Sequence, residues 1–514
     1  MSYDALLSRS FSRHDQKKLG WAAFFGCLIT ALFFCFVSSF MHDHRFDTLG
    51  IMGLGGDFGG DLGDRRWGCG SGSGRLSLNF QAIATISLVA LVNLSLSAGV
   101  NLKSVLSKEE VAITQSLVIF PFLTATKIKE AKPICDYSQR GSDVCEMDGD
   151  VRIHGSSSTI FVASFDSDIL ARNTTSWHIR PYARKEDQTA MEHVRKFTVR
   201  TAMVSGEDLP LCTHNHSVPA IVFSVGGYAG NHFHDFSDVL IPLYLTSREF
   251  NGDVQFLIAN HYSSWTHKHK EILEKLSRHE IINIDQEDGV HCFPRMIVGL
   301  KNHKEFSIDP SRSQYSMKDF RQFLRSSYSL NRETAIKLRD GKGKGQPRLL
   351  IITRKRSRYF NNEGEIANMA QNLGFEVVLT EAKANLSRFS RIVNSCDVMM
   401  GVHGAGLTNI VFLPENGVLI QVVPLGGMEW LAKTYFGEPA RDMNIRYLEY
   451  KINKSESSLI QEFPLHHEVF RDPYGIQRKG WVEFKSVYLD RQNVKLDVGR
   501  FQQTLLKALQ LLRD

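Results

Sequence analysis

The stretch CDVMMGVHGAGLTNIVFLPENGVLIQVVPLGG, residues 396–427, carries the strongest fold signal in the chain. Two apolar runs enclose the turn VHGAGLTN, in which His403 is followed by Gly404 and Gly406. Short apolar runs bounded by turn residues are typical of strands buried on both faces. Glycines between such runs allow a tight turn or a close approach of the backbone to another group. The stretch therefore predicts two buried strands joined through a turn that is tightly packed or faces a ligand.

Similar apolar runs continue on both sides of this stretch and alternate with amphipathic segments. The predicted strands are 348–353, 375–380, 397–400, 417–424 and 445–450, and the predicted helices are 363–373, 385–395, 429–436 and 498–512. Buried strands that alternate with helices indicate a parallel, doubly wound sheet. Ligands of such sheets bind beyond the carboxyl ends of the strands.

The preceding part of the chain shows the same alternation in a weaker form. Strands are predicted at 158–165, 219–225, 253–260 and 280–285, helices at 231–248 and 266–278, and a bridging helix at 316–330. The Gly- and Lys-rich break RDGKGKGQP at 339–347 then separates the two parts. We therefore predict an α/β protein with two Rossmann-like lobes, residues 131–338 and 346–514, and a ligand cleft between them.

The N-terminal residues predict a membrane anchor. Residues 1–20 are basic, and residues 21–40 contain no charged side chain. At about 1.5 Å per residue this run just spans a hydrocarbon core of about 30 Å, and the basic flank favours a cytosolic N-terminus. We expect a single-pass type II protein with a Gly-rich stem at 41–130. A second apolar run at 76–100 contains several Ser, Thr and Asn residues, which favours a place in the stem over a second span.

Composition and scattered motifs add limits on partners and compartment. With 514 residues the chain exceeds one ordinary domain, and its formal net charge of +6 is spread along the sequence and gives no sign of a nucleic-acid partner. The cysteines beyond the stem fit two disulfides and a free thiol, or reduced core residues, equally well. These cysteines are Cys135, Cys145, Cys212, Cys292 and Cys396. Sequons for N-glycosylation stand at Asn93, Asn173, Asn215, Asn385 and Asn453.

The segment VGGYAGNHFHDFSDVLIPLY, residues 225–244, places polar groups where a predicted strand gives way to a helix. His234 and Asp238 are one turn apart, and Asp235 lies three residues before Asp238, so these side chains can share a face. A carboxylate there could deprotonate an acceptor hydroxyl. The alternative is that the acidic residues complement the dipole at the helix N-terminus.

A basic run follows the first strand of the second lobe. It extends from Arg354 to Arg358 and leads through Asn362 and Glu363 into a helix. Guanidinium groups at the carboxyl end of a strand suit a diphosphate, because they bind oxyanions bidentately. A solvated basic loop is the alternative.

The turn around His403 and a pair of acidic motifs leave further alternatives open. The glycines after His403 could turn backbone N–H groups toward an anion, although the spacing matches neither G-x-G-x-x-G nor a P-loop. A histidine there is structural or contacts a ligand. D-x-D pairs at 148–150 and 166–168 could hold a divalent cation against a diphosphate, but short carboxylate pairs are frequent and we expect no metal site.

Four segments together resemble glycosyltransferase family 61, specifically its plant, grass-expanded group of xylan arabinosyl- and xylosyltransferases. They are CDYSQRGSDVCEMDGDVRIHG (135–155), GGYAGNHFHDFSDVLIPLY (226–244), RKRSRYFNNEGEI (354–366) and VHGAGLTNIVFLPENG (402–417). The resemblance covers about residues 130–512, and the Gly-rich insert and the run at 76–100 match no family pattern. It implies a type II Golgi membrane protein with a GT-B fold and a luminal catalytic part.

The resemblance also implies roles for single residues. An inverting transfer uses one carboxylate base, which we match to Asp235, with His234 and Asp238 as further catalytic candidates. The R-x-x-x-R arrangement of the family falls on Arg354 and Arg358 and implies contact with the donor diphosphate. The remaining residues assigned to the donor UDP-sugar are Asn362, Glu363, His403, Gly404 and Gly406.

The function implied is transfer of a pentose from a UDP-sugar onto the xylan backbone, with arabinofuranose preferred over xylose. Transfer of xylose to N-glycans is a variant. No cofactor or metal is expected, because protein cations and helix ends stabilise the leaving UDP in GT-B enzymes. Expected partners are a UDP-pentose, a xylan or other glycan, the Golgi membrane and a complex of Golgi enzymes. The rival from another class is a non-catalytic glycan-binding scaffold; the missing glycine fingerprint disfavours a nicotinamide dehydrogenase.

Overall fold

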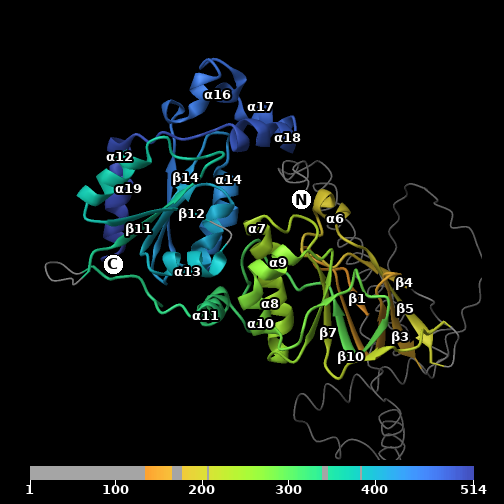
Figure 1. Ribbon diagram of the computed structural model, residues 1–514. Helices are drawn as coiled ribbons and strands as arrows, with labels where there is room; N and C mark the ends of the chain where they lie inside the picture. Colours follow the sequence, from red (N-terminus) through yellow and green to blue (C-terminus); the bar gives the residue numbers. More distant parts are fainter. Residues whose placement is uncertain (1–133, 165–175, 205–207, 339–344, 383–384) are drawn as a thin grey trace, which may run out of the picture. The chain divides into compact units, whose positions relative to one another are not determined.

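The computed structural model describes residues 134–164, 176–204, 208–338, 345–382 and 385–514 (Figure 1). These residues belong to one compact unit of the chain. Within them, no helix is long and apolar enough to cross a membrane. The predicted cytosolic tail, anchor and stem, and the apolar run at 76–100, lie outside the described residues.

The second half of the described chain forms a five-stranded sheet in which every strand pair is parallel. In spatial order its strands are β12 (Glu376–Glu381), β11 (Arg348–Thr353), β13 (Val398–Val402), β14 (Val418–Val423) and β15 (Arg446–Lys451). All residues of β13 and β14 are buried, as their apolar sequences predict. The order, second strand first and then first, third, fourth and fifth, is that of a doubly wound sheet.

Helices cover both faces of this sheet (Figure 1). One buried cluster joins the sheet to α12 (Glu363–Asn372) and α19 (Val498–Leu511). Another joins its opposite face to α13 (Leu386–Asn394) and α15 (Glu438–Asp442). The predicted segment 429–436 becomes α14 (Glu429–Ala432), followed by a π-helix at Lys433–Gly437. The strands and helices predicted for this half are therefore confirmed.

The first half contains a mixed sheet, which corrects the prediction of a parallel one. Its main path is β4 (Ser176–Ile179), β5 (Phe197–Met203), β3 (Thr159–Ser164), β2 (Val144–His154), β10 (Val290–Val298), β7 (Ala220–Ser224), β8 (Gln255–Ala259) and β9 (Ile282–Asn283), with β1 (Cys135–Asp136) on β2 and β6 (His214–Asn215) on β10. The strand β2 is antiparallel to both β3 and β10, whereas β10, β7, β8 and β9 run parallel.

The strand β2 was not predicted, because acidic residues interrupt its apolar pattern. Its sequence VCEMDGDVRIH buries Cys145 and Met147 before Gly149, and Val151 and Ile153 after it. Gly149 has φ of +102°, and the register with β10 shifts beside it, so the alternation resumes after a bulge. A period-two pattern with polar residues on the exposed face indicates a half-buried antiparallel strand, not a strand buried on both faces.

The helices predicted for the first half are present. The segment 231–248 is a continuous helical run of α7 (His232–His234), a π-helix (Asp235–Leu240) and α8 (Ile241–Ser247), followed by a 3-10 turn at Arg248–Phe250. The others are α9 (Ser263–Lys268), α10 (Lys270–Leu276) and α11 (Met317–Tyr328), and an unpredicted short helix is α6 (Gln188–Glu192).

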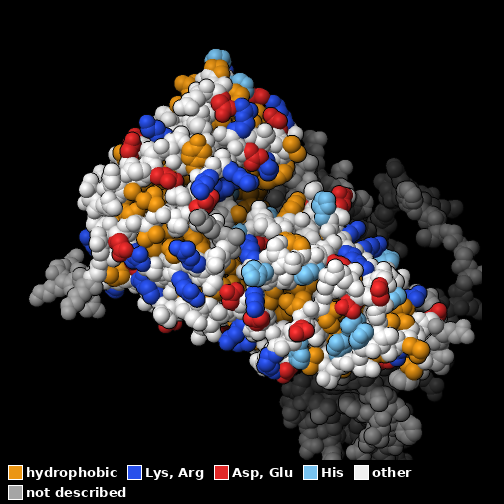
Figure 2. All heavy atoms as spheres, in the orientation of Figure 1, with side chains coloured by type: hydrophobic (Ala, Val, Ile, Leu, Met, Phe, Trp, Pro, Cys, Tyr) orange, Lys and Arg blue, Asp and Glu red, His pale blue; other side chains and the backbone are white. Residues whose placement is uncertain are grey.

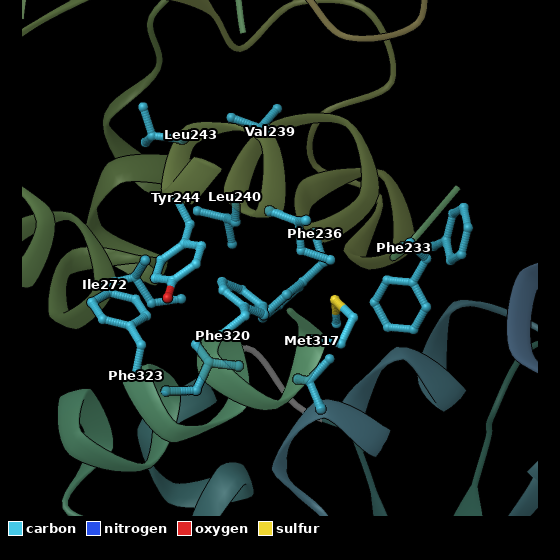
Figure 3. Close-up of a cluster of buried hydrophobic side chains, with 14 of the residues drawn as sticks. Phe233, Phe236, Val239, Leu240, Leu243, Tyr244, Ile272, Met317, Phe320 and Phe323 are labelled. Atoms are coloured by element: carbon cyan, nitrogen blue, oxygen red, sulfur yellow. The ribbon is translucent and has the colours of Figure 1, made fainter. Parts of the chain in front are cut away.

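A shared apolar cluster fixes the helical run 232–247. Figure 3 shows Phe236, Leu240 and Tyr244 of this run directed toward side chains of α11. The ring of Phe320 lies 5.2 Å from that of Tyr244 and 6.4 Å from that of Phe236. Since these side chains are buried, the helical run has a defined rotation, which sets the direction of its polar side chains.

Between β15 and α19 the chain makes an excursion that the sequence analysis did not predict. It contains 3-10 turns at Lys454–Glu456 and Ser458–Gln461, then α16 (Glu468–Arg471), α17 (Pro473–Arg478), α18 (Trp481–Phe484) and a π-helix at Lys485–Asp490. Helices of four to six residues are too short to produce a clear apolar period.

Candidate functional site

Two arginines lie against the turn that follows β13. Arg354 and Arg358 come directly after β11, which neighbours β13 in the sheet. A Cβ atom on Gly404 would lie 2.7 Å from Nη1 of Arg354 and 2.7 Å from Nη1 of Arg358. The φ of Gly404 is also +147°, which other residues rarely adopt. Glycine at this position therefore makes room for the two guanidinium groups.

The arginine pair has no carboxylate partner within ion-pair distance in the described part of the chain. Burial lowers the pKa of Arg354, and burial together with the charge of Arg354 lowers the pKa of Arg358 to about 9. The Nε of Arg358 is buried and has no hydrogen-bond partner among the described residues. Two half-buried like charges, with no carboxylate within ion-pair distance among the described residues, favour binding of an anion with several oxygen atoms.

His403 presents a neutral ring beside this pair. Gln421 Nε2 donates to His403 Nδ1 at 2.6 Å, and the Tyr447 hydroxyl donates to Gln421 Oε1 at 3.0 Å. Burial, then the charges of Arg358 and Arg354, lower the pKa of His403 to about 3. Because Nδ1 accepts a hydrogen bond, the neutral ring carries its proton on Nε2. His403 can thus donate one hydrogen bond without adding a third charge.

The other residues predicted for the donor site differ in their surroundings. Asn362 Nδ2 donates to the Leu496 carbonyl at 2.9 Å, and its Oδ1 accepts from Leu496 N at 3.0 Å, so Asn362 is a structural clamp rather than a donor ligand. Glu363 is partly buried at the start of α12, and burial raises the pKa of its carboxyl. A Cβ on Gly406 would meet Ile352 at 3.4 Å, an ordinary contact.

Asp235 is enclosed by donors at the start of the helical run 232–247. Its Oδ1 accepts from Gly230 N at 2.7 Å and from Trp265 Nε1 at 2.8 Å. Its Oδ2 accepts from Lys268 Nζ at 2.6 Å and from His269 Nε2 at 3.2 Å. Burial would raise the pKa of Asp235, but the hydrogen bonds and charges of His269 and Lys268 outweigh it and hold the pKa well below its usual range.

These contacts favour a structural role for Asp235 over the role of proton acceptor that the resemblance implied. The side chain of Asp235 has no exposed surface, and both of its oxygens are occupied. A base needs an open oxygen or nitrogen within hydrogen-bond reach of the substrate and a pKa near the working pH. Asp235 instead holds α9 and α10 to the helical run.

Asp238 and His234 form a hydrogen-bonded pair one turn further on. Asp238 Oδ2 accepts from Tyr182 Oη at 2.9 Å, from Arg184 Nε at 2.7 Å and from His234 Nδ1 at 2.9 Å. Arg184 Nη2 also donates to Asp238 Oδ1 at 2.8 Å. Burial would raise the pKa of Asp238, but Arg184 and His234 hold it well below its usual range. Asp238 is therefore a buried, ionised partner that orients the imidazole.

His234 is the member of this pair that a substrate can reach. Its side chain is 20% exposed, and Nε2 has no hydrogen-bond partner among the described residues. With its Nδ1 proton donated to a carboxylate, the ring leaves a lone pair on Nε2, the arrangement of a general base. Gly227, with φ of +57°, lets Tyr182 approach this cluster, since a Cβ there would lie 2.7 Å from its ring.

The helix that carries His234 contacts the turn that carries His403. His232 Nε2 lies 3.2 Å from Asn409 Oδ1, in the 3-10 helix Ala405–Phe412 that follows the turn. The ring of Phe436 lies 5.7 Å from that of Phe233 and 5.7 Å from that of His403. Phe436 thus packs both against Phe233, the neighbour of His234 in the chain, and against His403, which lies beside the arginine pair.

The sequence comparisons assign much of this region to a known family. A family model described as Glycosyltransferase 61 matches residues 233–420, which include His234, both arginines and His403. A beta-1,2-xylosyltransferase of rice (Oryza sativa subsp. japonica) is 45% identical over 393 residues, 74% of this chain and 84% of the relative. The chain belongs to the glycosyltransferase 61 family.

Other members of the family are similarly close. An alpha-1,3-arabinosyltransferase of rice is 47% identical over 383 residues, 74% of this chain and 65% of the relative. A xylan glycosyltransferase of Arabidopsis thaliana is 37% identical over 398 residues, 74% of this chain and 80% of the relative. The match thus spans just under two thirds of the rice arabinosyltransferase.

Several partners in this family 61 site were not predicted from the sequence. Tyr182 and Arg184 lie in a loop without a recognisable pattern, some 50 residues before the aspartate that they bind. Lys268 and His269 belong to the run HKHK at 267–270. The sequence signal that could have revealed them is a pair of adjacent basic residues on a helix with a buried face. One residue of such a pair is buried and then needs a hydrogen-bond acceptor.

Other predicted features occupy ordinary structural positions. Asp148 and Asp150 flank the bulge of β2, and Asp150 forms an ion pair with Arg152 at 2.5 Å. No group of three or more His, Cys, Asp or Glu side chains that could hold a metal occurs among the residues described. The D-x-D pair at 166–168 lies outside them.

The cysteines and sequons complete the placements. Disulfides join Cys135 to Cys145 and Cys212 to Cys292, and Cys396 is a buried free thiol, in line with one of the two alternatives from the sequence. The sequons at 215, 385 and 453 are exposed, and their glycosylation stays a prediction. Those at 93 and 173 lie outside the described residues.

Proposed function

We propose that the chain is an inverting glycosyltransferase that moves arabinofuranose from UDP-arabinofuranose onto the xylan backbone. The observation that carries this proposal is the arginine pair at Gly404, because two half-buried guanidinium groups with no carboxylate within ion-pair distance among the described residues suit a diphosphate. The names of the two rice relatives support a pentose as the transferred sugar, and the name of the Arabidopsis relative supports xylan as the acceptor. Transfer of xylose to xylan or to an N-glycan is the alternative, since a rice xylosyltransferase is nearly as similar as the arabinosyltransferase.

The donor side of the reaction uses protein cations. In the proposal, Arg354 and Arg358 bind the diphosphate oxygens, and His403 Nε2 adds a neutral hydrogen bond. As the sugar–oxygen bond breaks, negative charge grows on the leaving UDP, and fixed guanidinium groups stabilise it without reorganisation. The face shown in Figure 2 intersperses basic and acidic side chains.

The acceptor side uses the histidine–aspartate pair. In the proposal, His234 Nε2 takes the proton of the acceptor hydroxyl as its oxygen attacks the anomeric carbon from the face opposite UDP. The bond to UDP breaks in the same displacement, which inverts the anomeric centre. Asp238 stabilises the imidazolium that forms, and Tyr182 and Arg184 keep Asp238 ionised and in place.

The wider setting of the enzyme is part of the proposal. Two α/β halves, with the base on one and the diphosphate ligands on the other, support a GT-B architecture. The anchor at 21–40 would hold the catalytic part in the Golgi lumen, where disulfides persist, as a single-pass type II protein. A non-catalytic glycan-binding scaffold is disfavoured, because a scaffold needs neither a base with an open lone pair nor a pair of adjacent guanidinium groups without a carboxylate partner.

The test is incubation of the full-length chain in detergent with a panel of UDP-pentoses and xylohexaose, with and without EDTA. We expect pentosylated xylohexaose with UDP-arabinofuranose as the best donor, and no effect of EDTA. A UDP-binding chain that transfers no pentose would favour the scaffold. Preference for UDP-xylose would select the alternative donor, and loss of transfer in EDTA would indicate a metal requirement.

A further inference from the structure

Glu305 is a partly exposed carboxylate beside the histidine–aspartate pair, and no step above uses it. It lies in the loop between β10 and α11, and its side chain is 39% exposed. Its Oε2 accepts from Arg184 Nη2 at 2.9 Å and from Ser237 Oγ at 3.3 Å. Its Oε1 has no hydrogen-bond partner among the described residues. One oxygen is therefore fixed by the protein, and the other is open.

A single guanidinium nitrogen ties this carboxylate to the reacting pair. Arg184 Nη2 donates both to Glu305 Oε2 and, at 2.8 Å, to Asp238 Oδ1. Ser237, which also contacts Glu305, precedes Asp238 in the same π-helix and accepts from Phe306 N at 3.0 Å. Glu305 is thus held at a set position relative to His234, which Asp238 orients. Asp238 is buried with both oxygens engaged, so of these two carboxylates only Glu305 can receive a ligand.

Aromatic rings border the same cluster. The ring of Tyr228 lies 4.8 Å from that of His234, and Tyr228 is only partly buried. Tyr435, also partly buried, packs its ring 5.0 Å from that of Phe233. The pKa of Tyr435 is raised, first by burial and then by the charge of Glu305. The Tyr435 hydroxyl is therefore close enough to Glu305 to be influenced by its charge. Both tyrosines remain protonated at neutral pH and present apolar ring surface.

The chemistry of this cluster selects the kind of ligand. An ionised carboxylate accepts hydrogen bonds and donates none, so its natural partner is a hydroxyl. The negative charge repels a phosphate, which separates Glu305 from the binding of the donor diphosphate. Ring surface beside a few well-placed polar atoms is the usual lining of a site for a small ring-shaped ligand. A neutral sugar, with hydroxyls on its edges and C–H groups on its faces, satisfies all three conditions.

We propose that Glu305 Oε1 binds a hydroxyl of the acceptor sugar next to the one that His234 deprotonates. Glu305 then fixes the rotation of the acceptor ring and thereby decides which hydroxyl meets Nε2 of His234. This assignment rests on the proposed transfer, but it concerns binding of a neutral glycan and is measurable without transfer.

The test compares Glu305→Gln with Glu483→Gln, an exposed glutamate of α18, in the full-length chain. Calorimetry measures xylohexaose binding with UDP present, UDP binding alone and, by thermal scan, Tm. Loss of a hydrogen bond to a charged group weakens binding about tenfold to hundredfold. We expect that loss for xylohexaose with Glu305→Gln, with UDP affinity and Tm unchanged, and no effect of Glu483→Gln.

Three outcomes would overturn the inference. They are unchanged xylohexaose affinity in Glu305→Gln, an equal loss of UDP affinity in that variant, or no binding of xylohexaose by the wild type. If the wild type binds xylohexaose, Glu305→Gln does not, and no UDP-pentose is transferred, Glu305 binds the glycan as inferred and the proposed transferase function is wrong.

Discussion

At the residue scale, His234 and Asp235 are chain neighbours with opposite roles. Asp235 accepts four hydrogen bonds and is fully buried, whereas His234 keeps Nε2 open and uses Nδ1 to contact Asp238. The sequence favoured the aspartate, because the family resemblance implied a carboxylate base. What decides between them is the set of partners contributed by distant segments, and a linear motif does not contain those partners.

Replacement of His234 by Ala tests this assignment. We expect the rate of transfer to fall about 10²- to 10⁴-fold, because a positioned base contributes that much, while UDP affinity stays unchanged. His267→Ala, an exposed histidine of α9, serves as the control and should retain full activity. Initial rates and calorimetric UDP titration measure the two effects. A His234→Ala variant with wild-type turnover would return the role of base to another residue.

The arginine pair makes a separate prediction. Arg358→Ala should weaken UDP binding about tenfold or more, because a charge-assisted bond to phosphate is lost. Uridine, which lacks phosphate, should bind the variant and the wild type equally. Arg356→Ala, an exposed residue of the same basic run, is the matched control. Equal UDP affinity of Arg358→Ala and wild type, measured by calorimetry, would contradict the diphosphate site.

Burial of neutral His403 makes stability depend on pH. Its pKa is about 3 in the folded chain, against about 6.5 in the unfolded chain. Between these values the unfolded state binds the extra proton, so folding stability falls as pH falls, by up to about 1.4 kcal/mol per pH unit. His403→Gln should therefore lose less Tm than wild type between pH 7 and pH 5. Identical losses in thermal scans would show that His403 is not buried as a neutral ring.

At the element scale, the sequence predicted the strands and helices whose apolar pattern is strong and did not predict those whose pattern is weak. The strands β11, β13 and β14 are almost wholly apolar, and each was predicted to within a residue or two of its observed ends. The strand β2 mixes acidic residues with a glycine bulge, so it gave no clear period and was not predicted. The antiparallel pairing of β2 with β3 and β10 was therefore missing from the predicted sheet.

The π-helix at Asp235–Leu240 was equally hidden, although the helix around it was predicted. Its irregularity depends on packing of Phe236 and on the hydrogen bonds of two buried aspartates, which involve residues 30 to 60 positions away. Such π segments are frequent at functional sites, because they redirect side chains within a helix. Here Asp238 and Ser237 both belong to the segment and contact the groups that surround His234.

Packing between α11 and the helical run 232–247 should be a large contribution to stability. Phe320→Ala removes a fully buried ring that contacts Phe236 and Tyr244, and the expected loss is about 3–5 kcal/mol in the free energy of unfolding. Urea unfolding measures it. Leu506→Ala, at a half-exposed position of α19, should lose far less. Similar losses for the two variants would contradict the packing shown in Figure 3.

At the scale of the whole described unit, the proposed chemistry is divided between the two halves. The second half contributes two arginines and a neutral histidine for the diphosphate, and the first contributes a base and an open carboxylate for the acceptor. The sequence predicted the arginines and the turn as a donor site, because strand ends and basic residues are readable in one segment. The acceptor side joins four separate segments, and only the folded chain brings them together.

The proposed reaction also fixes the stereochemistry of the product. Direct attack by an acceptor hydroxyl, activated by a single base, inverts the anomeric centre. NMR of the product formed by the full-length chain from UDP-arabinofuranose and xylohexaose reads that configuration. We predict one added arabinofuranosyl group with anomeric configuration opposite to that of the donor. Retention of configuration, or no transfer of any pentose by a chain that binds UDP, would contradict it.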